Sequence, residues 1–257
     1  MEHYTIIEPI NCGKYGSVYK ARDKSNHIVA IKKMPLIRHD VNHFENTSII
    51  HRESTNWKKV TGKNNILPLK EFYTNKDEVW FISEYCSKGT LNDIIPSLHN
   101  DSDIKYTLKQ ILIGINNCHN ENIAHCDIKP CNILLSDDNE WKLCDFGCSQ
   151  ETYFENSGLF SKKGTPLFIA PELYGFNGYG KNVDVWALGI IAYMLVNNGA
   201  HPFPLDTNFK QHIIDGKFVW HNIVISKEFK DLVHLCLNSD YKNRLTSEEA
   251  LKHTYFS

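Results

Sequence analysis

The chain has 257 residues, of which 42% are hydrophobic and 23% are charged, a balance that excludes an intrinsically disordered protein. Its formal net charge is −2, so no strong positive field indicates binding to nucleic acid. No apolar run approaches the roughly 18 residues of a membrane-spanning helix, so we expect no membrane contact.

The first residues carry neither the basic stretch nor the apolar stretch of a secretory signal. This predicts an intracellular location, cytoplasmic or nuclear. The eight cysteines lack the two-residue spacing of a zinc knuckle, so we expect free thiols in a reducing compartment.

The first third of the chain is rich in β-branched and aromatic residues, which predicts strands. The expected strands are residues 4–11, 17–22, 28–33, 67–73 and 79–85, and one helix should run from residue 44 to about residue 60. From residue 90 the apolar residues recur at helical spacing, and residues 183–196 are apolar nearly all round. We therefore expect an α+β fold in which a small antiparallel β-rich lobe, residues 1–85, precedes a helical lobe, residues 86–257. A cleft between two such lobes is the default ligand site.

A glycine-containing turn, residues 10–18, links the first two expected strands. Two glycines three apart, Gly13 and Gly16, are a weak signal, and an ordinary hairpin turn explains them as well. A strand follows Gly16, which disfavours a dinucleotide fold, because there the glycine motif opens a helix. Such a hairpin can instead lie over nucleotide phosphates and offer backbone N–H groups without Cβ clashes.

A lysine, Lys32, ends the apolar strand that begins Val-Ala-Ile. A lysine in that setting must find a partner or reach solvent. Glu53 on the following helix is the favoured carboxylate partner, and Glu45 is the alternative. The alternative is that Lys32 is a surface lysine on an edge strand and has no functional role.

The strongest signal is the segment 125–132, His-Cys-Asp-Ile-Lys-Pro-Cys-Asn. Phosphoryl transfer needs an aspartate to accept or orient a hydroxyl hydrogen and an amide oxygen five residues later to bind magnesium. Asp127 and Asn132 have that spacing. Lys129 can neutralise the transferring phosphoryl group.

A second segment, Asp145-Phe146-Gly147, would supply a carboxylate oxygen to magnesium and a glycine for a sharp backbone turn. Further along the chain, Ala-Pro-Glu ends at Glu172, with which Arg244 could pair. Each tripeptide alone is weak evidence, but their order and spacing together are poorly explained by coincidence.

These segments together resemble the eukaryotic protein kinase superfamily over essentially the whole chain. Residues 18–24 and 48–53 are similar to cyclin-dependent kinases, whereas residues 164–172 are more similar to calcium/calmodulin-type kinases, so no subfamily is assigned. Lys129-Pro130 and Gly164-Thr165 resemble the serine/threonine pattern, although a dual-specificity enzyme could carry both. The resemblance implies a bilobal kinase-like fold, ATP and Mg²⁺ as cofactors, and protein substrates with serine or threonine acceptors.

The resemblance also implies the roles of individual residues. It assigns catalysis to Lys32, Glu53, Asp127, Lys129 and Thr165, and metal binding to Asn132 and Asp145. It assigns ATP contacts to Ile10, Asn11, Cys12, Gly13, Lys14, Tyr15, Gly16, Ser17, Val18, Ala30, Lys32, Ser83, Glu84, Cys86 and Leu134.

One of these positions, Asn11, departs from the family pattern, and another, Ser83, bounds the expected adenine pocket. Asn11 stands where the first of three glycines should be, and we expect the turn to survive because Asn tolerates left-handed backbone angles. Ser83 occupies the gatekeeper position behind adenine, and a local backbone group could satisfy its hydroxyl.

Cys126 precedes Asp127, where many kinases carry an arginine that pairs with an activating phosphate. The expected phosphosite is Ser161, and the nearby cations, Lys162, Lys163 and Lys181, are expected to be solvent-exposed. We therefore expect phosphorylation of this segment to matter little for activity.

Two other functions remain open at this stage. A pseudokinase or scaffold of the same fold would normally lose the lysine or one of the aspartates, and all are present. A small-molecule phosphotransferase could share the segment 125–132, but Thr165 and the Ala-Pro-Glu segment favour protein substrates. The sequence names no activating subunit.

Overall fold

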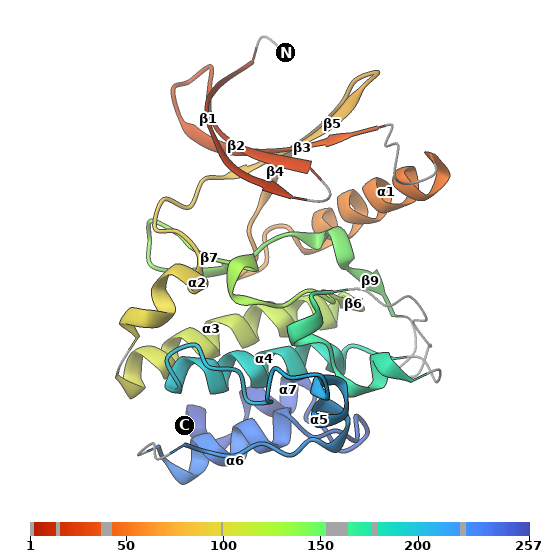
Figure 1. The fold of residues 1–257 in the computed structure, drawn as a ribbon. Helices are drawn as coiled ribbons and strands as arrows, with labels where there is room; N and C mark the ends of the chain where they lie inside the picture. The colour runs from red at the N-terminus through yellow and green to blue at the C-terminus, as the bar shows by residue number, and fades with distance from the viewer. Residues whose placement is uncertain are drawn as a thin grey trace.

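The computed structural model describes residues 3–13, 16–36, 43–98, 100–152, 164–175, 179–221 and 225–257, with the backbone alone at residues 43–45. Figure 1 shows a strand-rich part at the N-terminal end of the chain and a helical part that carries the C-terminus. Among the described residues, none of the helices combines the length and apolar character needed to cross a lipid bilayer.

The N-terminal part is one antiparallel sheet in the order β1-β2-β3-β5-β4. Its strands are β1 (Tyr4–Gly13), β2 (Gly16–Asp23), β3 (Ile28–Pro35), β4 (Leu69–Thr74) and β5 (Glu78–Glu84). The five expected strands are all present, with ends shifted by a few residues. The helix α1 (His43–Val60) lies beside this sheet and contacts β4.

The C-terminal part is mainly helical. Its helices are α2 (Leu91–Ile94), α3 (Asp101–Asn120), α4 (Asn182–Val196), α5 (Phe209–Asp215), α6 (Lys227–Cys236) and α7 (Ser247–Leu251). Two short hairpin-like pairs accompany them, β6 (Ile123–Ala124) with β9 (Gln150–Glu151) and β7 (Ile133–Leu135) with β8 (Trp141–Leu143). Single 3₁₀ turns are η1 (Ile95–Ser97), η2 (Pro130–Asn132), η3 (Phe146–Cys148), η4 (Pro166–Phe168), η5 (Pro171–Tyr174) and η6 (Thr254–Phe256).

The helix α4 forms the centre of the helical part, as its sequence predicts. Nearly all of its side chains are buried, and it contacts both α3 and α6. Figure 1 shows α3 and α4 next to each other, with α6 and α7 on the side away from the sheet. The predicted α+β architecture is therefore confirmed, while the boundary near residues 85 and 86 stays a prediction.

The expected pair between Glu172 and Arg244 is formed in this core. Two parallel hydrogen bonds of 2.7 and 2.8 Å join the guanidinium to the carboxylate, and the side chains are 0% and 6% exposed. The guanidinium also lies 5.1 Å from the ring centroid of Trp186. The ion pair ties the segment after η4 to the loop before α7, far apart in the sequence.

Removing one member of this pair leaves a buried, uncompensated charge. We predict that Glu172→Ala lowers the free energy of unfolding by about 3–5 kcal/mol. Urea denaturation followed by tryptophan fluorescence measures the change. The matched control is Lys252→Ala, which breaks an exposed ion pair with Glu248 and should cost much less. Equal losses for the two variants would contradict the structural role of Glu172.

Candidate active site

Three elements bring one cation and two carboxylates together. Lys32 on β3 places its Nζ 2.6 Å from Oε1 of Glu53 on α1 and 2.8 Å from Oδ1 of Asp145, which precedes η3. The side chains of Lys32 and Glu53 are 15% and 0% exposed, whereas 40% of the Asp145 side chain is accessible. Lys32 therefore has the partner that its setting demands, and this partner is Glu53; the side chain of Glu45 lies outside the described residues.

The charged groups of this cluster change one another's pKa values. Packing by protein atoms would lower the pKa of Lys32, but the charges of Asp145 and Glu53 outweigh it and raise the pKa well above its ordinary value. Packing would likewise raise the pKa of Asp145, but Lys32 lowers it to about 2. Burial raises the pKa of Glu53, whose Oε2 is buried without a hydrogen-bond partner. The cluster thus holds Asp145 ionised and leaves one unused acceptor beside it.

The carboxylate of Asp127 is surrounded by donors. Its Oδ1 accepts hydrogen bonds from the backbone N and Oγ1 of Thr165, at 3.0 and 2.8 Å. Its Oδ2 lies 2.7 Å from Nζ of Lys129 and accepts a bond of 3.0 Å from Nδ2 of Asn132. Lys129 also donates to Oγ1 of Thr165 at 2.7 Å. The structure thus brings three other predicted site residues together around the carboxylate of Asp127.

Gly164 lets the segment of Thr165 approach the segment of Asp127. Its φ is +103°, and a Cβ there would lie 2.6 Å from the carbonyl oxygen of Cys126. Any other residue at position 164 would push Thr165 away from Asp127.

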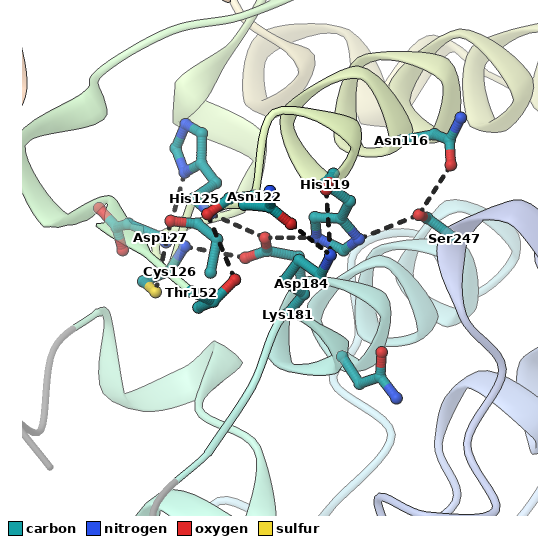
Figure 2. Close-up of polar contacts among 12 residues, drawn as sticks. Asn116, His119, Asn122, His125, Cys126, Asp127, Thr152, Lys181, Asp184 and Ser247 are labelled. Carbon is teal, nitrogen blue, oxygen red and sulfur yellow. Dashed lines mark hydrogen bonds and ion pairs between the residues drawn. The ribbon is translucent and has the colours of Figure 1, made fainter. Parts of the chain in front are cut away.

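Asp184, for which the sequence pattern predicted no role, anchors the segment before Asp127. Figure 2 shows its carboxylate among backbone and side-chain donors: it accepts hydrogen bonds of 2.8 Å from the backbone N of both His125 and Cys126. His119 Nε2 lies 2.9 Å from the same carboxylate, and His119 Nδ1 lies 2.9 Å from the hydroxyl of Ser247.

These bonds hold a strained backbone in place. Cys126 is a non-glycine residue with φ of 64°, a conformation that persists only where the surroundings enforce it. Asp184 is 1% exposed, so its carboxylate needs such donors. A charged residue in the first turn of an otherwise apolar helix was the sequence signal for this role.

One expectation about this region is wrong. Lys181 was expected to be solvent-exposed, but it is half-buried, and its Nζ donates a hydrogen bond of 3.0 Å to the carbonyl of His119 (Figure 2). The carbonyls at the C-terminal end of a helix lack partners within the helix. The carbonyl of His119 accepts from the backbone N of Asn122 at 3.0 Å, and Lys181 supplies a further donor to it at the end of α3. Ser161, Lys162 and Lys163 lie outside the described residues.

Close packing of β2 against β3 requires a glycine in the turn between β1 and β2. A Cβ on Gly16 would lie 2.1 Å from the backbone oxygen of Lys33, so only glycine allows β2 to pack here against β3. Asn11 was expected to use left-handed backbone angles, but it lies within β1 with no positive φ, so the turn does not need that tolerance. Ile10, Cys12 and Gly13 are exposed, whereas Lys14 and Tyr15 lie outside the described residues.

The remaining residues predicted to hold ATP line β2, β3, the end of β5 and β7. Val18, Ala30 and Leu134 are half-buried, as is Ser17, whose hydroxyl donates to Cys12 Sγ at 3.3 Å. Ala30 pairs directly with Ser83 across β3 and β5.

The end of β5 carries the three residues expected near adenine. The hydroxyl of Ser83 donates to the carbonyl of Glu84 at 3.3 Å, the local satisfaction that its sequence suggested. Glu84 pairs with Lys142 at 2.7 Å. Burial raises the pKa of the Cys86 thiol to about 12, so it should be unreactive.

The predicted metal ligands have suitable chemistry for a hard cation. The amide of Asn132 uses Nδ2 toward Asp127, which leaves Oδ1 with only a 3.9 Å contact to Cys131 Sγ. An amide oxygen and the accessible carboxylate of Asp145 are oxygen donors of the kind magnesium prefers. Within the described ranges no three His, Cys, Asp or Glu side chains converge, so the ion would need further oxygens from phosphates or water.

Comparisons with known proteins agree with this geometry. Residues 4–256 match the family model described as protein kinase domain. The chain is 32% identical to serine/threonine-protein kinase 4 homolog B of Dictyostelium discoideum, over 98% of this chain and 23% of that protein. It is 31% identical to human death-associated protein kinase 2, over 100% of this chain and 72% of the relative. It is also 31% identical to calcium-dependent protein kinase 29 of Arabidopsis thaliana, over 99% of this chain and 49% of that protein.

The chain thus spans about a quarter to three quarters of the length of these relatives. The family match covers nearly all of its residues, including every element that forms the site. This chain belongs to the protein kinase domain family.

Proposed function

We propose that this chain transfers the γ-phosphoryl group of ATP to serine or threonine hydroxyls of protein substrates. The observation that carries the proposal is the set of donors around Asp127, which fixes one carboxylate beside Lys129 and Thr165. The names of the relatives, which are serine/threonine kinases, support the same reaction.

Each side chain has a distinct task in this proposal. Lys32 binds phosphate oxygens, and Glu53 holds Lys32 in position. Asp127 accepts or orients the hydrogen of the attacking hydroxyl, and Lys129 stabilises negative charge on the transferring group. Asp145 and Asn132 would hold magnesium, which, when bound, neutralises charge on the phosphates.

A binding-only module of the same fold is the alternative. Such a module would be expected to lose Lys32, Asp127 or Asp145. In this chain all three are present: Lys32 and Asp145 lie in one ion-pair cluster, and Asp127 lies in a second set of hydrogen bonds. The transferase is therefore the better proposal, with ATP and Mg²⁺ as its cofactors.

The first test is Asp127→Asn, which keeps the shape but removes the acceptor charge. We expect phosphoryl transfer to a peptide library, measured with radiolabelled ATP, to fall by roughly 10²–10⁴-fold. Lys32→Met should also remove most transfer. Asp138→Asn, an exposed aspartate outside the site, is the control and should retain wild-type rates. Near-wild-type transfer by Asp127→Asn would refute the proposed role.

The small side chain of Ser83 gives a second prediction. It is 5% exposed and pairs with Ala30, so a nucleotide-site ligand meets little bulk behind adenine. We expect ATP-competitive inhibitors with bulky aromatic extensions to inhibit the wild type and to lose potency by at least tenfold against Ser83→Met. Potency should be compared at matched ratios of ATP to its KM. Equal potency would show that no space lies behind Ser83.

Cys126 bears on regulation. Its side chain is buried and lines a small cavity of about 20 Å³ together with Gly164 and Thr165, and this cavity has room for about one water molecule. A phosphate adds about −1.5 to −2 charge and orders a segment by pairing with a cation. The thiol of Cys126 cannot make that pair.

We therefore predict that phosphorylation of the segment before Thr165 changes the rate by less than about tenfold, or 1.4 kcal/mol in the barrier. The measurement compares phosphatase-treated enzyme and Ser161→Ala with the untreated wild type. Burial raises the pKa of the Cys126 thiol well above its ordinary value, and the charge of Arg52 on α1 acts in the opposite direction, so Arg52 is a nearby cation that could meet a phosphate. A larger loss that Arg52→Ala reproduces would contradict the prediction and identify Arg52 as the phosphate partner.

A further inference from the structure

One face of α1 carries three buried residues at consecutive helical spacing. Glu53, Asn56 and Trp57 are 0%, 1% and 3% exposed, and their spacing of three and four residues puts them on the same side of the helix. Glu53 pairs with Lys32. Asn56 and Trp57 play no part in the chemistry proposed above, although they face the same region.

Asn56 begins a chain of buried hydrogen bonds that ends at the turn after Asp145. Its Nδ2 donates to Oγ of Ser149 at 3.0 Å. The hydroxyl of Ser149 has one hydrogen, which it donates to the carbonyl of Phe146 at 2.6 Å. The backbone N of Ser149 reaches the same carbonyl at 3.0 Å. The chain therefore connects α1 to the residue that follows Asp145.

The backbone at this turn is strained. Asp145 has φ of 64°, a left-handed conformation that non-glycine residues adopt only where their surroundings hold them. Its own side chain accepts from the backbone N of Gly147 at 3.4 Å, which is a long bond. The bonds to the Phe146 carbonyl are shorter, so they are better placed to maintain the turn that aims Asp145 at Lys32.

Neighbouring residues reinforce the same connection. The ring of Trp57 stacks on those of Phe146 and Phe81, with centroids 6.0 and 5.9 Å apart, and its Nε1 donates to the carbonyl of Leu67 at 2.6 Å. One turn further along α1, Lys59 pairs with Glu151. Asn56, Trp57 and Lys59 of α1 thus all contact residues that follow Asp145.

We propose that Asn56 and Ser149 are positioning residues that tie α1 to the turn of Asp145, so that Lys32 stays between its two carboxylates without help from another protein. The inference rests on the proposed function, because it concerns the geometry of that reaction. Asn56 and Ser149 act through Glu53 and Asp145 and do not themselves touch the reacting groups. The helix is held by contacts within the chain.

The test uses Asn56→Leu, Ser149→Ala and the double variant in the whole chain, without any added protein. Each single variant should lower kcat/KM for ATP about tenfold, while KM for the peptide stays within twofold of the wild type. The double variant should be no worse than the poorer single variant, because both residues belong to one hydrogen-bond chain. Ser149→Ala removes a single oxygen atom and keeps the test available if Asn56→Leu does not fold.

Hydrogen–deuterium exchange supplies a readout that does not depend on activity. Amides of α1 should exchange faster in all three variants than in the wild type. The matched control is Thr107→Val, which removes a buried hydrogen bond of 3.0 Å from Trp141 Nε1, away from α1. It should lower thermal stability yet leave α1 exchange and the KM for ATP unchanged.

The outcomes separate the two proposals. An inactive wild type whose α1 is protected would refute the proposed function and leave the link between α1 and the turn intact. An active wild type whose variants keep kcat/KM for ATP within twofold, with unchanged exchange, would overturn the positioning role. Effects that multiply in the double variant, or that fall on the peptide KM, would also overturn it.

Discussion

The charge of Lys32 determines which parts of this molecule must meet. A cation that is 15% exposed on an apolar strand is stable only beside carboxylates, and the two that it finds come from α1 and from the turn before η3. Leaving Glu53, whose side chain is 0% exposed, without the lysine would bury an unpaired charge. Oε2 of Glu53 already lacks a partner, so the cluster has little tolerance for further loss. The positions of β3, α1 and Asp145 are consequently interdependent.

A second buried carboxylate, that of Asp184, fixes the positions of segments in the helical part. Asp184 extends from α4 and accepts from the backbone at His125 and Cys126, so the segment of Asp127 is attached directly to the most deeply buried helix. The two carboxylates proposed to act in the reaction, Asp127 and Asp145, each lie at or next to a non-glycine residue with positive φ. Strain of this kind costs about 1–3 kcal/mol and survives only where packing and hydrogen bonds fix the backbone. In this chain Asp184 fixes the backbone at Cys126, and the hydrogen bonds to the Phe146 carbonyl fix the backbone at Asp145.

The sequence predicted the features that depend on local residue patterns. It could not predict contacts between segments that meet only in the folded chain. Runs of β-branched and aromatic residues predicted the five strands. The charge of Lys32 required a carboxylate partner, so Glu53 could be favoured over Glu45. The pairing of Glu172 with Arg244 followed from charge and order alone. The charge in the first turn of an apolar helix indicated that Asp184 needs partners, but no local pattern could show that these partners are the backbone groups next to Asp127. Nor could it show that Lys181 would bend toward the end of α3. Gly16 is necessary because β2 approaches β3 at Lys33, and Asn56 meets Ser149 only after α1 has docked; both facts require the fold.

The two polar centres must also keep a constant separation, since the proposed reaction needs Lys32 and Asp127 at the same time. The ring of Phe146 is the physical connection: it stacks on Trp57 of α1 and lies 4.9 Å from the ring of His125, whose backbone is bound to Asp184. Movement of α1 away from the sheet would therefore displace Phe146, and with it both the turn of Asp145 and the packing on His125. Apolar stacking alone permits sliding, because it has little directional preference. The hydrogen bonds from Asn56 through Ser149 to the Phe146 carbonyl are directional and buried, so they define the one arrangement in which both centres are complete.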